Sequence, residues 1–210
     1  AAAKSPDIAL LFIGLTEEYE SEGFDRKHME LPEVHDALVE AVYKVNPNIV
    51  VVLAGGSPVE MPWYNRVKGI INTYLAGQAG ASALADIIAG IKCPCGKLAE
   101  TYPMKGSDNP SYGNFALPQK DVIYKESIYI GYRYYDKAQK KVRFPFGYGL
   151  SYTNFEYSKA KLSKKKIHPG ESIDVTFSIK NTGEFDGAEI AQVYIEKGDT
   201  KIYRAPKELK

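Results

Sequence analysis

Three short apolar runs set the pattern of the first half of the chain. Residues 8–14 (IALLFIG) and 49–54 (IVVVLA) are continuously apolar, and 69–75 (GIINTYL) repeats the pattern more weakly. Runs of this length and composition are typical of strands that are buried on both faces, as in a parallel sheet. The pattern therefore predicts a central sheet built from these segments.

Segments with helical spacing separate the strands. One lies between Pro32, which suits a first helical turn, and Pro47, which ends the helix; its apolar positions are Val34, Leu38, Val42 and Val45. Residues 79–90 (AGASALADIIAG) predict a second helix that buries Leu84, Ile87 and Ile88, with Gly90 as a left-handed cap. Strands that alternate with helices predict an α/β fold, a three-layer sandwich with a mainly parallel sheet.

After Thr153 the sequence pattern changes to alternating apolar and polar residues. Residues 155–163, 171–183 and 188–198 show this period of two, with turn residues between them. The pattern predicts three antiparallel strands of an all-β sandwich. A complete sandwich of the immunoglobulin type needs about seven strands. We therefore expect the second domain to be truncated.

Residues 93–153 show neither helical spacing nor the period of two of a strand, and they are rich in Gly, Pro, Tyr and Asp. A loop region of this length is usually functional or packed against another domain. It contains two aromatic tracts, IYIGYRYYD (128–136) and FPFGYGLSYT (144–153). Their rings could form part of a core or a wall that contacts carbohydrate.

Composition and charge exclude several classes of partner. The 210 residues are 44% apolar and 25% charged, and 27 basic residues nearly balance 26 acidic ones. The resulting charge of +1 gives no reason to expect nucleic acid or an anionic membrane as a partner, and Lys164–Lys166 is interpreted as a solvated turn. No apolar run approaches the length of a membrane span, and the first residues do not resemble a signal peptide. We expect the chain to begin inside a domain.

The cysteines and histidines give no metal or cofactor site. Cys93 and Cys95 are separated by one residue, and a disulfide between them would be strained, so we expect free thiols. That favours a reducing compartment and a cytoplasmic location. His28 lies near Glu30, His35 is predicted on a helix surface, and His168 in an exposed turn. None of them has the three or four convergent ligands that metal sites need.

The loop after the first strand, Tyr19–Pro32, concentrates candidate chemistry. In a parallel sheet, loops that leave the carboxyl ends of strands gather at one edge, where ligands bind. Ser21 and Gly23 flank Glu22 with little steric bulk, and Asp25 and Arg26 could support the loop by pairing with each other. Glycoside hydrolysis needs a carboxyl with a raised pKa as acid. From the pattern alone, a catalytic carboxylate and a solvated acidic loop both remain open.

The loop after the second strand, Gly55–Trp63, lies at the same predicted edge. Its sequence, GGSPVEMPW, has neither the spacing of a dinucleotide-binding loop nor the lysine of a P-loop. Ser57 lacks the frame of a nucleophile elbow and is interpreted as a helix N-cap. Trp63 is either a platform for a sugar ring or an anchor that packs a short helix on the sheet.

Several segments, read in order, resemble the carboxy-terminal half of glycoside hydrolase family 3, in its β-glucosidase branch. They are ESEGFDRKHMELP, VNPNIVVVLAGGSPVEMPW, YLAGQAGASALADIIAG, CGKLAETYP, YKESIYIGYRYYD and FPFGYGLSYTNFEYS. The resemblance runs in collinear order over nearly the whole chain. It implies an α/β sandwich domain over residues 1–152, lacking its amino-terminal part, and a truncated fibronectin type III-like domain over 153–210.

The resemblance also implies a catalytic role. Glu22, within SEGFDR, stands at the general acid/base position of the family, whereas Glu18 and Glu20 are interpreted as solvated. The aspartate nucleophile lies on an amino-terminal TIM-like barrel, which this chain lacks and which would be its partner in cis. The implied substrate is a β-linked gluco-oligosaccharide or a β-glucoside, without a cofactor. We expect the chain alone to be inactive, and a homo-oligomer is left open.

The tract FPFGYGLSYT matches the junction into the fibronectin-like domain, which favours a structural role for its aromatic rings. Cys93 and Cys95 stand where the family usually has Asn and Ser. Two other classes of function remain open from the sequence. One is a non-catalytic carbohydrate-binding or domain-docking module, and the other is a regulatory α/β ligand-binding protein.

Overall fold

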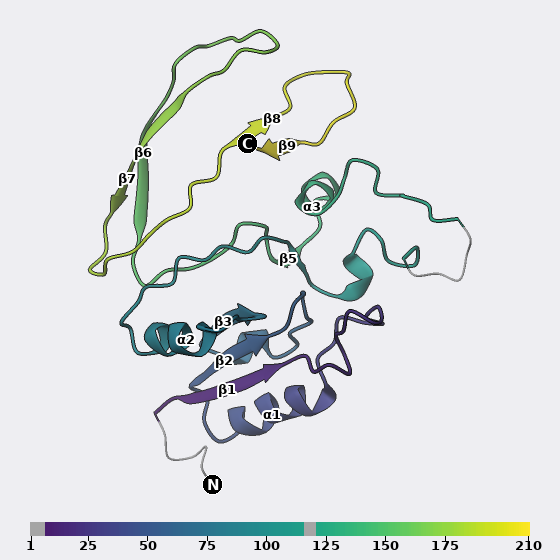
Figure 1. The fold of residues 1–210 in the computed structure, drawn as a ribbon, viewed down its shortest axis with the longest axis vertical. Helices are drawn as coiled ribbons and strands as arrows, with labels where there is room; N and C mark the ends of the chain where they lie inside the picture. Colours follow the sequence, from purple (N-terminus) through teal and green to yellow (C-terminus); the bar gives the residue numbers. More distant parts are fainter. Residues whose placement is uncertain (1–6, 116–120) are drawn as a thin grey trace. The chain divides into compact units, whose positions relative to one another are not determined.

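The computed structural model describes residues 7–115 and 121–210, which form two compact units (Figure 1). The first unit comprises Ala1–Leu84, Leu98–Tyr148 and Gln192–Lys210, and the second comprises Ala85–Lys97 and Gly149–Ala191. The division into domains at residues 152 and 153 stays a prediction.

The first unit is built on a parallel sheet of three strands in the order β1-β2-β3. These strands are β1 (Ala9–Gly14), β2 (Ile49–Ala54) and β3 (Gly69–Tyr74). They coincide with the three apolar runs, which confirms the predicted α/β fold. The arrowheads of β1 and β2 point towards the loop after β1, drawn in purple in Figure 1. The loops after all three strands therefore leave from one edge of the sheet.

Strand β1 is not buried on both faces, contrary to the prediction from its continuous apolar run. Ala9 and Ile13 are buried, whereas Leu10 is exposed and the side chain of Phe12 is 63% exposed. β1 is one of the two edge strands of the sheet. Burial in β1 follows the alternation of the strand and not its composition, whereas Val52, which pairs with Phe12 in the central strand, is buried.

Helix α1 (Glu33–Tyr43) forms where predicted, but only one of the four apolar positions at helical spacing is buried. Val34 is 70% exposed, and Leu38 and Val45 are also exposed. Val42 is buried, and Val39, which was outside that set, is buried as well. Residues three or four positions apart share a helix face, and the face that carries Val39 and Val42 also carries the polar residue Asp36. A prediction based on apolar residues alone could not identify this face as the buried one.

Asp36 faces inwards because it accepts a hydrogen bond from Trp63. The Trp63 Nε1 to Asp36 Oδ1 distance is 2.7 Å, and Trp63 is fully buried in the core. A buried indole cannot serve as a sugar platform, so the anchor interpretation of Trp63 is correct. Trp63 precedes the short 3-10 helix η2 (Tyr64–Arg66). Ser57 is not a helix N-cap, contrary to the prediction.

Helix α2 (Gly80–Ile88) also forms where predicted, and Gly90 adopts the expected left-handed conformation with φ of 71°. Its burial differs from the prediction. Leu84 and Ile87 are half-buried, and Ile88 is 38% exposed.

Residues 98–148 contain more regular structure than their sequence indicated. The strands β4 (Tyr102–Pro103) and β5 (Val142–Phe144) pair antiparallel, and the helix α3 (Tyr132–Ala138) overlaps the end of the first aromatic tract. A short 3-10 helix, η3, spans Gly106–Asp108. The ring of Phe144 contacts three other rings, those of Tyr64, Tyr102 and Tyr148. These contacts show that rings of the second tract help to build the first unit.

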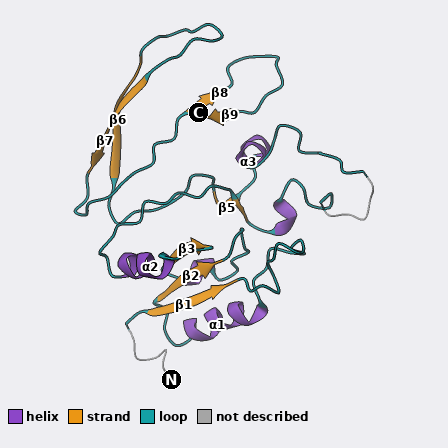
Figure 2. Ribbon diagram, in the orientation of Figure 1, coloured by secondary structure: helices purple, strands orange, loops and turns teal. Residues whose placement is uncertain are grey.

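The carboxy-terminal segment is antiparallel, as predicted, but its third strand pairs differently. β6 (Phe155–Leu162) and β7 (Val175–Asn181) form a two-stranded sheet in the second unit (Figure 2). β8 (Tyr194–Glu196) instead pairs with β9 (Lys207–Leu209), and both belong to the first unit. In the described part of the chain, no helix has the length and apolar character to cross a membrane.

We predict that Val39→Ala lowers the free energy of unfolding by about 2 kcal/mol, because it removes two methyl groups from a fully buried site. Val34→Ala, on the exposed face of the same helix, should change it by less than about 0.5 kcal/mol. Chemical denaturation of the two variants measures the difference. Equal losses would contradict the burial pattern of α1.

We also predict a pH dependence from Asp36. Burial raises the pKa of this carboxyl, and the hydrogen bond from Trp63 only partly opposes the shift. A raised folded-state pKa means that Asp36 supports stability below its unfolded pKa, and that this support is lost as pH rises through the folded value. Asp36→Asn keeps an acceptor for Trp63 but does not titrate.

Unfolding measured between pH 3.5 and 7 should therefore show the Asp36→Asn variant gaining stability relative to the parent as pH rises. The exposed Asp7→Asn is the matched control. Asp36→Asn losing stability relative to the parent as pH rises would show instead that the carboxylate is favoured in the folded state.

Candidate active site

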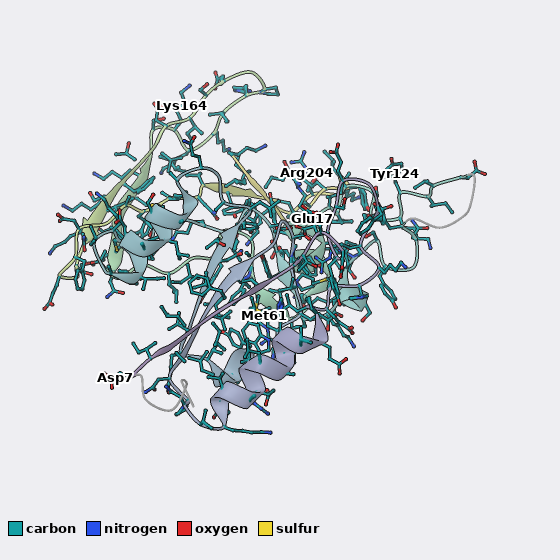
Figure 3. All side chains as sticks on the ribbon, turned by 60° about the horizontal axis from the view of Figure 1, so that its bottom comes forward. Asp7, Glu17, Met61, Tyr124, Lys164 and Arg204 are labelled. Carbon is teal, nitrogen blue, oxygen red and sulfur yellow. The ribbon has the colours of Figure 1, made fainter. Side chains whose placement is uncertain are left out.

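The candidate site lies where the loops after β1 and β2 leave the carboxyl edge of the sheet. Gly14 and Ala54 are paired at the end of the two strands. A Cβ atom on Gly14 would collide with the backbone carbonyl of Ala54, so only glycine allows this close approach. In Figure 3, Asp7 and Glu17 mark the chain just before and just after β1. The acidic loop thus begins directly at this edge.

Glu22 lies in a tight turn within that loop. Ser21 and Phe24 form an isolated antiparallel bridge, and the Gly23 amide donates to Ser21 Oγ at 3.3 Å. All four residues from Ser21 to Phe24 are exposed. Among the described residues, none forms a hydrogen bond or an ion pair with the Glu22 carboxylate. The turn therefore presents Glu22 to solvent.

Glu20 is held by hydrogen bonds, so its interpretation as a solvated residue is wrong. Its Oε1 accepts from the Gly56 amide at 2.6 Å, and its Oε2 accepts from Ser57 Oγ at 2.8 Å. Glu20 is half-buried, whereas Glu18 is exposed as expected. The sequence hid this difference because Gly56 and Ser57 are 36 and 37 residues away.

Arg26 also contacts the loop after β2 and not its neighbour Asp25. Its Nη1 donates to Ser57 Oγ at 2.7 Å and to the Pro58 carbonyl at 3.0 Å. The expected pairing of Asp25 with Arg26 is therefore wrong, and Asp25 is exposed. Burial lowers the pKa of the Arg26 guanidinium, and the negative charge of Glu20 opposes that shift. Ser57 is thus the hydroxyl that joins the two charged side chains.

The two histidines near this edge have different environments. His35 Nδ1 accepts from the Gly14 amide at 3.4 Å and is half-buried, so its predicted position on a helix surface is wrong. His28 is exposed, with its Nδ1 4.0 Å from the Glu30 carboxylate. Within residues 7–115 and 121–210, no group of three or more His, Cys, Asp or Glu side chains could hold a metal ion.

A cavity of about 870 Å³ lies beside the loop, within the first unit. Its lining combines both signs of charge with aromatic rings and includes Asp25, Arg26, His28, Glu100, Tyr112 and Tyr135. Volumes of this order accommodate small-molecule ligands. Tyr135 belongs to the aromatic tract that the sequence offered either as core or as a wall that contacts carbohydrate, whereas Glu100 and Tyr112 were not proposed as site residues.

One carboxyl and two phenol side chains lie close together near the same edge: Glu100 and Tyr74 are half-buried, and Tyr102 is fully buried. Burial raises the pKa values of Glu100, Tyr74 and Tyr102. The Tyr102 hydroxyl accepts from the Asn72 amide at 2.8 Å. Tyr74, at the end of β3, has φ of 50°, which is unfavourable for a residue with a bulky side chain. The charge of Glu100 contributes to the shifts of both phenols, so the three groups form one electrostatic cluster.

In the second unit, Cys93 and Cys95 are both free thiols, as predicted. Cys93 Sγ lies 3.0 Å from Ser151 Oγ and accepts from the Tyr152 amide at 3.3 Å. Lys97 forms an ion pair with Glu189 at 3.2 Å. These contacts join the segment after α2 to the segments before β6 and after β7 within that unit.

Comparison with known proteins identifies the family. The model of the glycosyl hydrolase family 3 C-terminal domain matches residues 1–152. The thermostable β-glucosidase B of Acetivibrio thermocellus is 52% identical over 100% of this chain, and a β-glucosidase of Kluyveromyces marxianus is 44% identical over 99% of it. The chain covers 28% and 24% of these two relatives. It therefore spans about a quarter of their length.

Solved structures agree with the sequence comparison. A family 3 β-glucosidase of Bifidobacterium adolescentis superimposes with a TM-score of 0.93 at 44% identity, covering 99% of this chain and 31% of that one. The K. marxianus β-glucosidase in complex with glucose gives a TM-score of 0.92 at 44% identity, covering 100% and 25%. The matching family model and these similarities show that the chain belongs to glycoside hydrolase family 3.

Proposed function

We propose that the chain is the carboxy-terminal portion of a retaining exo-β-glycosidase that removes terminal non-reducing β-D-glucosyl residues. Glu22 is the general acid/base, and the nucleophilic aspartate belongs to an amino-terminal TIM-like barrel in cis. Eight relatives with 41–52% identity are named as β-glucosidases, some of them as probable or putative, and four related structures contain glucose, which supports a β-glucoside or β-linked gluco-oligosaccharide as substrate.

The observation that carries this proposal is the exposed Glu22 carboxylate in a turn at the carboxyl edge of the sheet. An acid/base that serves a substrate held by another domain must be accessible and free to exchange a proton. Glu20, two residues earlier, is already engaged with Gly56 and Ser57. Glu22 has no such partner among the described residues, so the loop leaves one of these two carboxylates available for chemistry.

In the first step, the barrel aspartate attacks the anomeric carbon, and the bond from that carbon to the leaving oxygen breaks. Glu22 in its acid form donates its proton to that oxygen and becomes a carboxylate. In the second step, Glu22 takes a proton from water, whose oxygen attacks the anomeric carbon and releases the aspartate. Both steps together retain the anomeric configuration.

The geometry of retention sets a requirement for the missing partner. The two carboxyl groups of a retaining enzyme lie about 5 Å apart. The barrel must therefore dock beside the Ser21–Phe24 turn. The roles of Ser21, Gly23 and Arg26 in this proposal are to shape and support the loop. The assignment of residues 1–152 to the α/β sandwich and 153–210 to a fibronectin type III-like domain completes the proposed organisation.

We predict that the 210-residue chain alone does not hydrolyse an aryl β-glucoside, because it supplies only one carboxylate of the pair. A sensitive measurement is the release of 4-nitrophenol from its β-glucoside over many hours. Turnover that disappears in the Glu22→Gln variant would contradict the location of the nucleophile.

We further predict the behaviour of a chimera in which this chain replaces the matching 28% of the A. thermocellus β-glucosidase. The chimera should be active, and Glu22→Gln should lower kcat by roughly 10²–10⁴-fold, the usual contribution of general acid–base catalysis. Glu18→Gln, an exposed carboxylate in the same loop, is the matched control. Steady-state kinetics on cellobiose and on aryl β-glucosides make the measurement.

Added azide gives a second, chemical readout. Azide attacks the glycosyl-enzyme without needing a base, so the Glu22→Ala chimera should form β-glucosyl azide and recover turnover of an activated substrate. A folded chimera that is inactive, or one unaffected by Glu22→Gln, would overturn the assignment. Saturable binding of glucose or cellobiose to the chain alone would then favour a non-catalytic carbohydrate-binding module.

A further inference from the structure

Both stems of the Glu22 turn are attached to the same short segment after β2. Glu20 precedes Glu22 by two residues and bonds to Gly56 and Ser57. Arg26 follows Glu22 by four residues and bonds to Ser57 and Pro58. The acidic loop is therefore fixed at two points on either side of the residue that it presents, and segment 56–58 is the common base.

The chemistry of these contacts makes them strong. The Ser57 hydroxyl donates to the Glu20 carboxylate and accepts from the Arg26 guanidinium, so opposite charges polarise it from both sides. Hydrogen bonds to ionised groups are shorter and stronger than neutral ones, and the distances of 2.6–2.8 Å agree. Arg26 and Ser57 are half-buried, which reduces competition from water.

Gly56 provides the space for this arrangement. A Cβ atom built on Gly56 would lie 2.8 Å from Glu20 Oε1 and 3.2 Å from Leu75 Cδ1. An alanine there would have to displace the Glu20 carboxylate from the position in which it accepts the Gly56 amide. The glycine and the glutamate thus depend on each other.

We propose that Glu20 is a positioning residue for the acid/base, and that the Glu20–Ser57–Arg26 clamp holds the Glu22 turn in register with the substrate. The proposal rests on the acid/base role of Glu22. Between the two fixed points the chain has only five residues, 21–25, and the Ser21–Phe24 bridge closes it further. Release of either stem lets Glu22 move, and a catalytic group misplaced by about 1 Å can lose roughly 10²-fold in rate.

A positioning role has a kinetic signature that a merely structural role lacks. Loss of folded protein lowers the rate on every substrate by the same factor. Misplacement of the acid lowers kcat/KM mainly for substrates with poor leaving groups, since 2,4-dinitrophenolate departs without protonation. The ratio of kcat/KM for 2,4-dinitrophenyl β-glucoside to that for cellobiose therefore reports the position of Glu22.

The test uses the full chain within the chimera described above. We expect Glu20→Ala and Ser57→Ala to lower kcat/KM on cellobiose by about 10–100-fold while changing it by less than about threefold on the dinitrophenyl substrate. Glu20→Gln retains the length and one acceptor, so it should recover part of the loss. Glu18→Gln should leave both values and their ratio unchanged.

A second pair of variants perturbs the clamp from its other side. Gly56→Ala should reproduce the selective loss of Glu20→Ala, because the new methyl group would lie only 2.8 Å from Glu20 Oε1 and would displace that oxygen. Gly77→Ala is the matched control, since a Cβ there would meet nothing within 4 Å. The two glycine variants keep every charged side chain of the loop intact.

The outcomes separate this proposal from the proposed function. Suppose that Glu22→Gln lowers kcat/KM selectively on cellobiose, but Glu20→Ala, Ser57→Ala and Gly56→Ala lower kcat/KM equally on both substrates. The clamp is then only structural, and the positioning role is wrong. If Glu22→Gln itself shows no selectivity, the acid/base assignment fails and the positioning role fails with it. Selective loss in all four variants, with partial recovery in Glu20→Gln, supports both.

Discussion

The parallel pairing of β1 with β2 is the constraint on which the rest of the site depends. Parallel strands place their carboxyl ends at one edge, so the loops after β1 and β2 meet although Glu20 and Gly56 are 36 residues apart in sequence. The close approach of Gly14 to the Ala54 carbonyl brings the two loops together from their first residues. Without this register, Ser57 could not join Glu20 to Arg26.

The buried core beneath that edge includes a polar contact. Trp63 is fully buried, and its indole nitrogen needs an acceptor, which Asp36 supplies from helix α1. This bond ties the loop after β2 to the helix that follows the acidic loop. The same helix places His35 against the Gly14 amide. One helix face thus supports both loops of the candidate site, which explains why polar residues occupy it.

The acidic loop divides its charges between structure and chemistry. Glu20 and Arg26 are desolvated in part and compensate each other through Ser57, while Glu22 and Asp25 remain exposed. A loop with several carboxylates would repel itself if all of them were held together. Here the Glu20 carboxylate is held near the Arg26 guanidinium through Ser57, while the Glu22 carboxylate stays exposed. The loop can therefore be stable and still present a reactive carboxyl group.

The sequence by itself determined the local elements and the family. The apolar runs predicted the three strands of the parallel sheet, helical spacing predicted α1 and α2, and Gly90 indicated the left-handed cap after α2, because each of these depends on neighbouring residues. The pair β4 and β5 and the helix α3 lay in the region without periodicity and were not predicted. The collinear motifs identified the glycoside hydrolase family 3 resemblance, which the family model and the relatives confirm. Glu22 was selected through that resemblance and not through its neighbours.

Tertiary structure alone decided which residue contacts which. It turned α1 so that Val39 and not Val34 is buried, paired β8 with β9, and separated Glu20 from Glu18. These choices depend on atoms that are tens of residues away in sequence. Hydrophobic periodicity reports only where apolar residues recur along the chain. It does not predict that Asp36 faces the core or that Ser57 bridges two charged side chains. The partners of polar side chains are therefore a property of the folded chain.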